Sequence, residues 1–426
     1  MPSSVLWIRI RSLLTLMAAA LVGGALVAAT PASHAHTIHS ADAEDPPRLY
    51  VTNQGEASVS IINMDTHEVE TTVDLTELGF SENAHPHHAI AEPDGSAWYV
   101  SLIGDNTVLQ FNADNEIISQ GSMQAPGLLS LHADNDHLFI ARSMMAVSPP
   151  QSLGMAPRSD LGLLEEIDVF IDRPHALATT PDGRFVYSAS LATNQFIGVD
   201  PTTRRGELST VDGDTHVIVQ MAPSPITNEI VGTGQTTAQL LFFDVEDDGT
   251  LTHTESVEVG AQPWHPVYSD DGERIFVPNK QSNDISVVDA TERRVVDTIT
   301  HDSFAEPHGA VLSPDGTRLY ISNNHQRGMM EDMARDMGMD PDAHDDHADH
   351  DDHEHHDEHD DHEHHDEHDE HAHHDEHDAH HDDEGHDHTT EDRPGTITVI
   401  DTETLEVVDV IEVGVYPTGI GTYTVR

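Results

Sequence analysis

The chain has 426 residues, no cysteine, a single lysine and a formal net charge of −60 at pH 7. Without cysteine it can form no disulfide bond, thiolate zinc site, iron–sulfur cluster or covalently attached c-type haem. A surface this acidic repels nucleic acid and anionic membranes, so neither is expected as a partner.

The N-terminal segment has the pattern of an export signal. Arg9 and Arg11 precede an uncharged run from Leu13 to Ala29, and Ser33-His34-Ala35 is a small-x-small cleavage motif. We therefore predict a cleaved signal peptide over residues 1–35 and a linker over residues 36–47. The mature protein is then expected in the periplasm or secreted, with no membrane span.

Beyond the linker, the sequence repeats a unit with a period near 44 residues, because the glycines of four matching turns are 88, 89 and 44 residues apart. The four copies are HPHHAIAEPDGSAWYV, RPHALATTPDGRFVYSA, QPWHPVYSDDGERIFVP and EPHGAVLSPDGTRLYIS. Alternating runs such as NDISVVD follow, and a further run such as RVVDTIT closes the unit. Four short strands in a unit of this length are typical of a β-propeller blade.

Seven innermost strands can be counted along the chain. They begin after His87, Gly127, His175, His216, Trp264, His308 and Thr418. The first unit has no innermost strand of its own, whereas YPTGIGTYTVR at the C-terminus supplies one with nothing after it. We therefore predict an all-β, seven-bladed β-propeller of four-stranded blades over residues 48–426. The C-terminal strand should complete the first blade and remove its free edge.

The segments LYVTNQGEASVSIINMDTHEVETTVDL and RLYISNN…GTITVIDTETLEVVDVIEVG resemble the YVTN-type β-propeller repeat. Relatives of that repeat include the haem d1 domain of cytochrome cd1 nitrite reductases. The sequence departs from the pattern in the third blade, where residues 143–170 lack a recognisable third strand, and in the seventh blade. The resemblance implies a fold and not a function, because such propellers serve as enzymes, carriers and adhesion modules.

A Met-rich and then His/Asp/Glu-rich segment, residues 328–393, interrupts the seventh blade between its second and third strands. It is too charged to bury a core, so we expect a disordered loop. Histidine and carboxylate are ligands of zinc, and the closely spaced histidines offer many alternative sites. A solvated acidic spacer is the alternative, although such a spacer needs no histidine. The candidate ligands of this histidine tract are His344, His347, His350, His353, His355, His356, His359, His362, His364, His365, His368, His371, His373, His374, His377, His380, His381, His386 and His388.

The histidines of the repeat form a second candidate metal site, at the mouth of the central channel and on the face that carries the tract. Zinc–nitrogen bonds are about 2.0–2.1 Å long, so only side chains from neighbouring blades are expected to share an ion. The alternative is a ring of histidines hydrated in a water-filled channel. The candidates are His87, His175, His216, His265 and His308, with His88 adjacent.

Copper is the competitor to zinc, because Met329, Met330, Met333 and Met337 would share one face of a helix. Thioethers favour Cu(I), whereas an apolar stripe packed on the propeller is the alternative interpretation. Haem is the less favoured cofactor.

No catalytic residue can be named, since the chain has no G-x-S-x-G motif, phosphate loop or dinucleotide fingerprint. The leading hypothesis is a non-enzymatic, monomeric metal-binding propeller that buffers or delivers zinc outside the cytoplasm. This architecture is similar to that of periplasmic metallochaperones that serve zinc ABC importers, which implies a metal-importer binding protein or another exported protein as partner. The alternatives are a redox or haem d1-like cofactor-binding propeller and a protein-interaction propeller with metal as a modifier.

Overall fold

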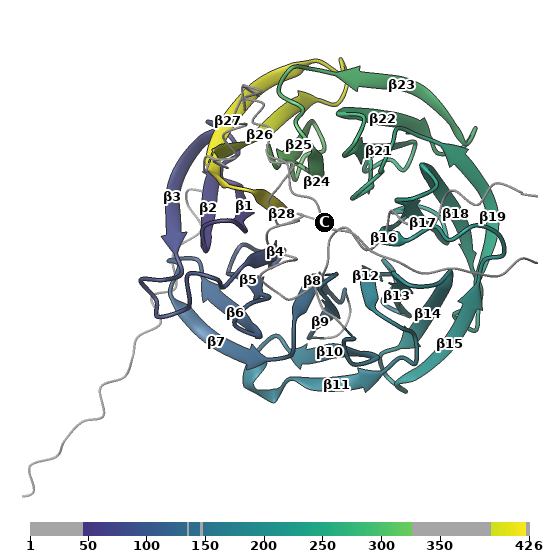
Figure 1. Cartoon of the computed structure of the whole chain (residues 1–426), viewed down its shortest axis with the longest axis horizontal. Coiled ribbons are helices and arrows are strands. Elements are labelled where there is room, and N and C mark those ends of the chain that lie inside the picture. The colour runs from purple at the N-terminus through teal and green to yellow at the C-terminus, as the bar shows by residue number, and fades with distance from the viewer. Residues whose placement is uncertain (1–45, 134–135, 145–147, 326–392, 423–426) are drawn as a thin grey trace, which may run out of the picture. The chain divides into compact units, whose positions relative to one another are not determined.

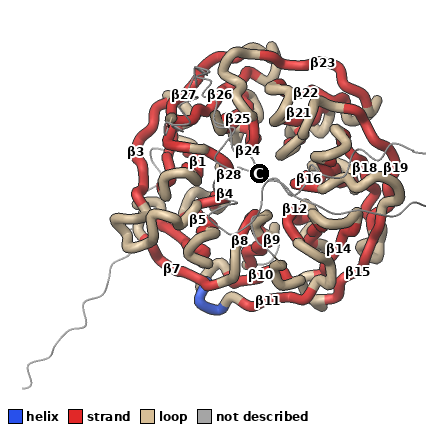
Figure 2. The backbone as a smooth tube through the Cα atoms, viewed as in Figure 1, coloured by secondary structure: helices blue, strands red, loops and turns tan. Residues whose placement is uncertain are grey.

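The computed structural model describes residues 46–133, 136–144, 148–325 and 393–422. These residues form seven four-stranded antiparallel sheets arranged as blades around a common axis (Figure 1). The predicted seven-bladed β-propeller is confirmed. Within the described part of the chain, the one helical segment is the short turn η1 (Leu161–Leu163), on the rim of the third blade (Figure 2).

The strands of each blade follow one another from the axis outward, except that blade 1 takes its innermost strand from the C-terminal end. Blade 1 consists of β28 (Pro417–Gly421), β1 (Arg48–Asn53), β2 (Ser58–Asn63) and β3 (Glu68–Asp74). Blade 2 consists of β4 (Pro86–Ala91), β5 (Ala97–Leu102), β6 (Thr107–Asn112) and β7 (Ile117–Ser122). Blade 3 consists of β8 (Pro126–Leu131), β9 (His137–Arg142), β10 (Ser152–Pro157) and β11 (Glu165–Asp168).

Blades 4 to 7 continue in the same way. Blade 4 consists of β12 (Pro174–Thr179), β13 (Val186–Ser190), β14 (Gln195–Asp200) and β15 (Arg205–Thr210), and blade 5 of β16 (Ile218–Pro223), β17 (Glu229–Gly234), β18 (Gln239–Val245) and β19 (Leu251–Glu258). Blade 6 consists of β20 (Val267–Tyr268), β21 (Arg274–Asn279), β22 (Asp284–Asp289) and β23 (Arg294–Thr300). Blade 7 consists of β24 (Pro307–Leu312), β25 (Arg318–Asn323), β26 (Pro394–Asp401) and β27 (Val407–Val415).

The C-terminal strand closes the ring, as predicted. β28 pairs antiparallel with β1, with Tyr50 opposite Gly421 and Val51 opposite Ile420. The Thr52 hydroxyl donates to the Gly419 carbonyl at 2.9 Å and lies 3.1 Å from the Thr418 hydroxyl. The two ends of the propeller are thus joined by backbone pairing and by buried side-chain hydrogen bonds.

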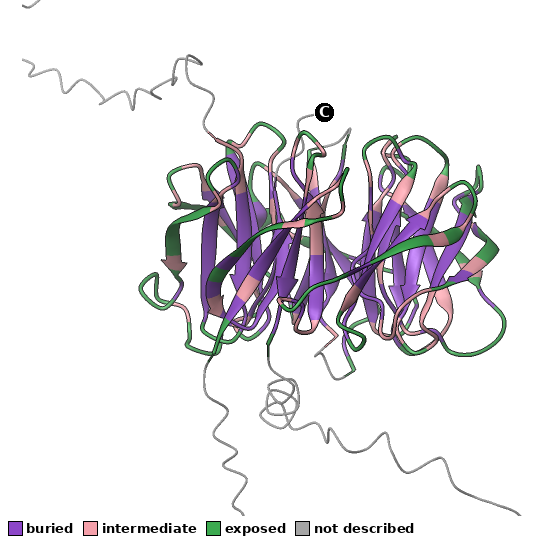
Figure 3. Ribbon diagram, turned by 90° about the horizontal axis from the view of Figure 1, so that it is seen from above, coloured by how far each residue is buried: buried purple, intermediate pink, exposed green. Residues whose placement is uncertain are grey.

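The core lies between neighbouring blades, because each sheet packs its faces on the sheets beside it. The inner three strands of a blade are almost entirely buried, whereas outermost strands such as β3 are largely exposed (Figure 3). Aromatic side chains bridge the layers: Trp98 of blade 2 stacks on Phe111 at 4.1 Å and on Tyr50 of blade 1 at 5.0 Å between ring centroids. This packing makes a rigid support for the strand ends near the axis.

The third blade corrects one prediction. Residues 152–157 form a regular third strand, β10, which pairs with both β9 and β11. Leu153 and Met155 are buried in the core. The segment was not recognised because glycine and proline, which are depleted in strands, weaken its pattern. The connection between the second and third strands therefore spans residues 143–151.

The seventh blade is interrupted between β25 and β26, where the sequence predicts the insertion. Asn323 at the end of β25 pairs with Pro307 at the start of β24 and with Thr396 at the start of β26. The interruption thus opens on the face at which the innermost strands begin, which we call the histidine face. Residues 326–392, with the Met-rich segment and the histidine tract, lie outside the described residues, as do residues 1–45 with the predicted signal peptide. No helix among the described residues is long and apolar enough to span a membrane.

Candidate metal centre

A recurring turn places histidines at the start of the innermost strands. In this turn a residue with left-handed φ precedes a proline, and the histidine follows the proline. His85, Arg173 and Glu306 have φ of 48°, 48° and 57°, before Pro86, Pro174 and Pro307. Proline fixes its own φ and disfavours the α conformation before it, so the chain bends sharply and then continues as an extended strand. The side chains that follow are held at the strand ends, on the histidine face.

Five histidines meet near the axis, and we call them the axial histidine cluster: His87, His88, His175, His265 and His308. All are buried, with exposed fractions between 2 % and 9 %. Their ring centroids are 5.9 Å apart for His87 and His175, 6.3 Å for His88 and His265, and 5.0 Å for His265 and His308. The rings thus form two series of contacts, one from His87 to His175 and the other from His88 through His265 to His308. Each series begins in blade 2.

The cluster brings histidines of non-neighbouring blades into contact, whereas the sequence predicts that only neighbouring blades share an ion. Blade 2 supplies His87 and His88, which contact His175 from blade 4 and His265 from blade 6. The innermost strands converge so closely on the axis that side chains from distant blades touch. The register of β4 against β5 also shifts between Pro86 and His88, and both of the consecutive histidines belong to the cluster. The His-His doublet in HPHHAIA was the available signal for this arrangement.

Hydrogen bonds fix the tautomers of two cluster histidines. His175 Nδ1 lies 2.9 Å from the Arg142 carbonyl oxygen, which can only accept, so Nδ1 carries the proton and Nε2 keeps a free lone pair when the ring is neutral. His88 Nδ1 accepts from the backbone N–H of Leu129 at 3.3 Å. A ring N–H donated to a carbonyl is the usual way in which a metal-binding histidine is oriented.

The carbonyl that orients His175 is itself held in place. The fully buried Arg142 side chain donates to the Gln124 carbonyl at 2.5 Å and to the Ser152 hydroxyl at 2.6 Å, and it forms an ion pair with Glu166. The third strand β10, which contains Ser152, therefore supports the cluster through Arg142.

Two ring nitrogens in the cluster lack a partner among the described residues. Nδ1 of His87 and Nδ1 of His308 are buried with no hydrogen bond to the protein. Most buried polar side-chain atoms in proteins are hydrogen-bonded, and an unpaired one calls for an explanation such as an ion or a water molecule. These nitrogens are therefore available to a bound species.

Burial lowers the pKa of every histidine in the cluster. The pKa of His88 and of His175 falls from 6.5 to about 4, mainly through burial. Burial holds the pKa of His87, His265 and His308 well below 6.5, and the neighbouring histidines lower it further. All five rings are thus neutral near pH 7, which is the form that binds a metal.

Lys280, the single lysine of the chain, lies beside the cluster. It is 7 % exposed, its Nζ is 5.1 Å from the Trp264 ring centroid, and its partner carboxylate on Glu306 is 3.7 Å away. Trp264 in turn contacts His308 at 4.8 Å. The positive charge of Lys280 contributes to lowering the pKa of His308.

The imidazole nitrogens of the cluster are suitable ligands for a transition-metal ion, but the rings are not yet arranged around a common point. Among the described residues no three His, Asp or Glu side chains already converge as metal ligands. However, two imidazoles on one tetrahedral zinc ion have ring centroids roughly 5 Å apart, given zinc–nitrogen bonds of about 2.0–2.1 Å. The observed separations of 5.0 to 6.3 Å approach that value, so ring rotations and small shifts would be needed to bind an ion.

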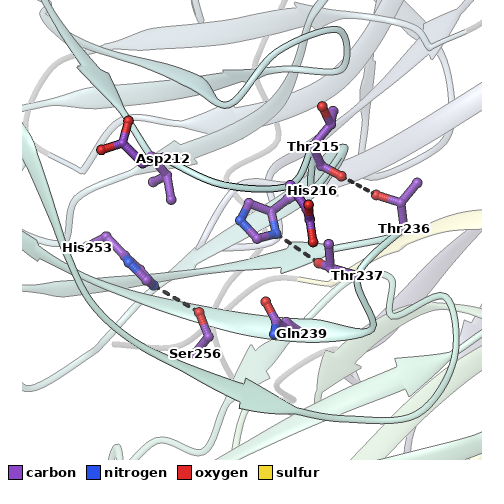
Figure 4. A pocket seen from close by; sticks show the side chains of 10 residues that line it. Asp212, Thr215, His216, Thr236, Thr237, Gln239, His253 and Ser256 are labelled. Atoms are coloured by element: carbon purple, nitrogen blue, oxygen red, sulfur yellow. Dashed lines mark hydrogen bonds between the residues drawn. The ribbon is translucent and has the colours of Figure 1, made fainter.

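His216 lies elsewhere, which corrects the predicted succession of histidines from blades four to seven. It lines a pocket of about 560 Å³ together with His253, Thr237 and Ser256 (Figure 4). His216 Nδ1 is 2.8 Å from the Thr237 hydroxyl. His253, which the sequence did not single out, lies in the outermost strand β19, where the repeat pattern assigns no histidine.

No protein-family model and no curated protein matches the sequence. Solved structures do match the fold. A protein of unknown function from Desulfotomaculum acetoxidans is similar with a TM-score of 0.61 at 12 % identity, over 90 % of this chain and 100 % of that chain. The periplasmic gluconolactonase of Pseudomonas aeruginosa is similar with a TM-score of 0.59 at 15 % identity, over 89 % and 99 %. A dihydro-haem d1 dehydrogenase is similar with a TM-score of 0.52 at 11 % identity, over 88 % and 74 %.

At these identities the similarity shows the β-propeller fold alone. Haem d1-binding and lactonase-like propellers are both among the structures that share it.

Proposed function

We propose that this protein binds zinc, with copper as the competing metal, and buffers or delivers it outside the cytoplasm. The observation that carries the proposal is the axial histidine cluster: five buried, neutral imidazoles from four blades, two of them with an unpaired buried nitrogen. Neutral imidazole is a preferred ligand of zinc and of copper. In this proposal the ion is cargo, and the cluster retains it.

The division of labour between cluster and tract follows from conformational entropy. If the tract is disordered without metal, as its composition predicts, it must be ordered around each ion, which costs free energy for every residue fixed. The cluster histidines are already positioned by their turns and by the blades behind them, so less ordering opposes binding. We therefore assign capture to the histidine tract and retention to the cluster, with a metal-importer binding protein or another exported protein as recipient.

The haem d1-like alternative is less favoured by the spacing of the rings. The cluster histidines contact one another across the axis at centroid distances of 5.0 to 6.3 Å. Such spacing suits a single ion, whereas a planar macrocycle is much wider and would have to push the histidines apart. The visible spectrum of the purified protein distinguishes a tetrapyrrole from zinc, which has no such absorption.

Calorimetric titration of the full chain with zinc at neutral pH tests the proposal. Replacing His175, His265 and His308 by alanine should abolish the tightest class of sites and leave most of the weaker capacity. A His301→Ala variant is the control, because His301 is exposed and its ring nitrogen bonds Ser303 in the same loop. If the triple variant is folded by circular dichroism and keeps its tightest site, the cluster does not hold the ion.

A further inference from the structure

The pocket that contains His216 has the chemistry of a cation site separate from the axial cluster. It is bounded by the connection from β15 to β16, by the turn between β17 and β18, and by β19. Its lining carries two histidines and two carboxylates, His216, His253, Asp212 and Asp214. None of the described residues that line it is a lysine or an arginine, so the pocket attracts cations and repels anions.

The backbone that carries His216 is held by side chains from both neighbouring blades. Its N–H donates to Asn194 Oδ1 at 2.9 Å, and Asn194 Nδ2 donates to the Asp214 carbonyl at 2.7 Å. On the other side, the Thr236 hydroxyl donates to the Thr215 carbonyl at 2.6 Å. A ligand on a segment fixed in this way needs little ordering when an ion binds.

In both His216 and His253, one ring nitrogen is left to bind a metal while the other is hydrogen-bonded to the protein. His253 Nε2 is 3.1 Å from the Glu255 carbonyl oxygen, which can only accept, so Nε2 carries the proton and Nδ1 has the lone pair. His216 Nδ1 is occupied by the Thr237 hydroxyl at 2.8 Å, so His216 would bind a metal through Nε2. Figure 4 shows the His216 ring directed into the pocket from one side and His253 on the other side.

The charges of the pocket also suit a divalent ion. Burial is the main cause that lowers the pKa of His216, the nearby His253 lowers it further, and Asp214 opposes the shift. The ring is therefore neutral near pH 7. A carboxylate in this pocket would offset part of the charge of a bound divalent ion, whereas no carboxylate is among the causes that shift the pKa of the axial cluster histidines.

We propose that His216 and His253, with Asp212 or Asp214, form a second binding site for a divalent transition-metal ion in the pocket between blades 4 and 5. Nowhere in the described part of the chain do three His, Asp or Glu side chains already converge as metal ligands, so these pocket side chains, which belong to β19 and to the connection before β16, would have to move toward an ion as it binds. Binding is weaker and exchange faster here than at a buried site. The site does not depend on the axial cluster and stands whether or not the cluster holds an ion.

Histidine modification by diethyl pyrocarbonate, read out by peptide mass spectrometry, tests the site in the full chain, because each histidine reports separately from the tract. Zinc should slow the modification of His216 and His253 together, several-fold, and leave the control His301 unchanged. In a variant with both Asp212→Asn and Asp214→Asn the zinc concentration that gives half protection should rise, since the carboxylate that offsets the charge of the ion is lost. In a His253→Ala variant the protection of His216 should disappear.

Two outcomes would overturn the site. One is that His216 and His253 are modified equally fast with and without saturating zinc. The other is that His216 stays protected in the His253→Ala variant, because zinc would then bind His216 without its proposed partner. Protection that persists in the His175, His265 and His308 triple variant supports the independence of the two sites.

Discussion

At the scale of single residues, burial decides which histidines can act as ligands at low pH. An exposed histidine becomes protonated near pH 6.5 and loses its metal. His88 and His175 have a pKa of about 4, so protons compete with a metal there only in more acidic solution. The cluster histidines should therefore respond differently to a drop in pH from histidines that are not buried.

We expect the tightest zinc site to persist as the pH falls from 7 toward 5, while the weak capacity falls steeply through about pH 6.5. The reason is that the cluster rings remain neutral at a pH at which exposed rings are charged. Zinc retained after equilibrium dialysis at a series of pH values measures both classes. Parallel loss of both classes would contradict the cluster as the tight site.

The same pKa values predict how the metal-free protein responds to acid. The folded-state pKa of these histidines lies below the unfolded value of 6.5, so between pH 6.5 and about 4 the unfolded chain binds more protons than the folded chain. The free energy of unfolding is therefore undiminished above pH 6.5 and falls as the pH drops toward 4. Thermal melts across this range should show the decline, and the decline should be smaller in the triple variant, which has lost three of these rings.

Lys280 is expected to weaken the binding of a cation at His308. Two unit charges 4 Å apart interact by about 4 kcal/mol at an effective dielectric constant of 20, and greater separation and Glu306 reduce this. Lys280→Met should therefore tighten the zinc site by about tenfold, or about 1.4 kcal/mol. Lys280→Arg keeps the charge and is the control. Unchanged affinity in Lys280→Met, measured by competition with a chelator, would show that the lysine is structural only.

At the scale of elements, the innermost strands approach one another so closely that side chains are excluded between some of them. A Cβ on Gly419 of β28 would lie 2.2 Å from the His87 carbonyl oxygen and 2.6 Å from the His88 Cα. Both atoms belong to the backbone of β4, so no side chain can move to make room. The position of the blade 2 histidines thus depends on a glycine in the closing strand.

We expect Gly419→Ala to cost about 1–3 kcal/mol of stability through overpacking and to weaken the tight zinc site as well, because β4 must shift. Gly162→Ala is the control, since its Cβ would come within 3.0 Å of the Asp160 carboxylate oxygen, on a side chain that can rotate, and no nearer than 4.0 Å to the Gln120 backbone oxygen. Denaturant unfolding and zinc titration of both variants measure the two effects. Equal behaviour of the two variants would contradict the close approach of β28 and β4.

The elements also show what the sequence could and could not predict. Period, strand alternation and turn residues specify the blades, and they predicted the closing strand and the interrupted seventh blade. β10 was missed because its Gly154 and Pro157 weaken the strand pattern, although Leu153 and Met155 face the core. The histidine contacts across the axis could not be predicted from the sequence. They depend on how far apart distant blades lie, which is set by the tilt and convergence of the strands and cannot be read from the sequence of a single repeat.

At the scale of the whole molecule, the ring of blades is closed by the pairing of β28 with β1. A chain that ends before Tyr416 lacks β28, the inner partner of β1, so blade 1 loses core contacts and exposes a strand edge. We expect such a chain to lose its cooperative unfolding transition. A chain that ends after residue 422 keeps all of β28 and is the control. The same melting temperature for both would rule out this closure.

The same pairing of β1 with β28 also determines when the molecule can fold during its synthesis. Thr52 and Thr418, which hydrogen-bond in the closed blade, are 366 positions apart. At about 5–20 residues per second, the ribosome needs on the order of 20–70 s to make the chain between them. During that interval the inner edge of β1 has no partner and is a template for aggregation. The nascent chain therefore needs protection until its C-terminal strand is made, and its large negative charge, which opposes association between chains, supplies part of that protection.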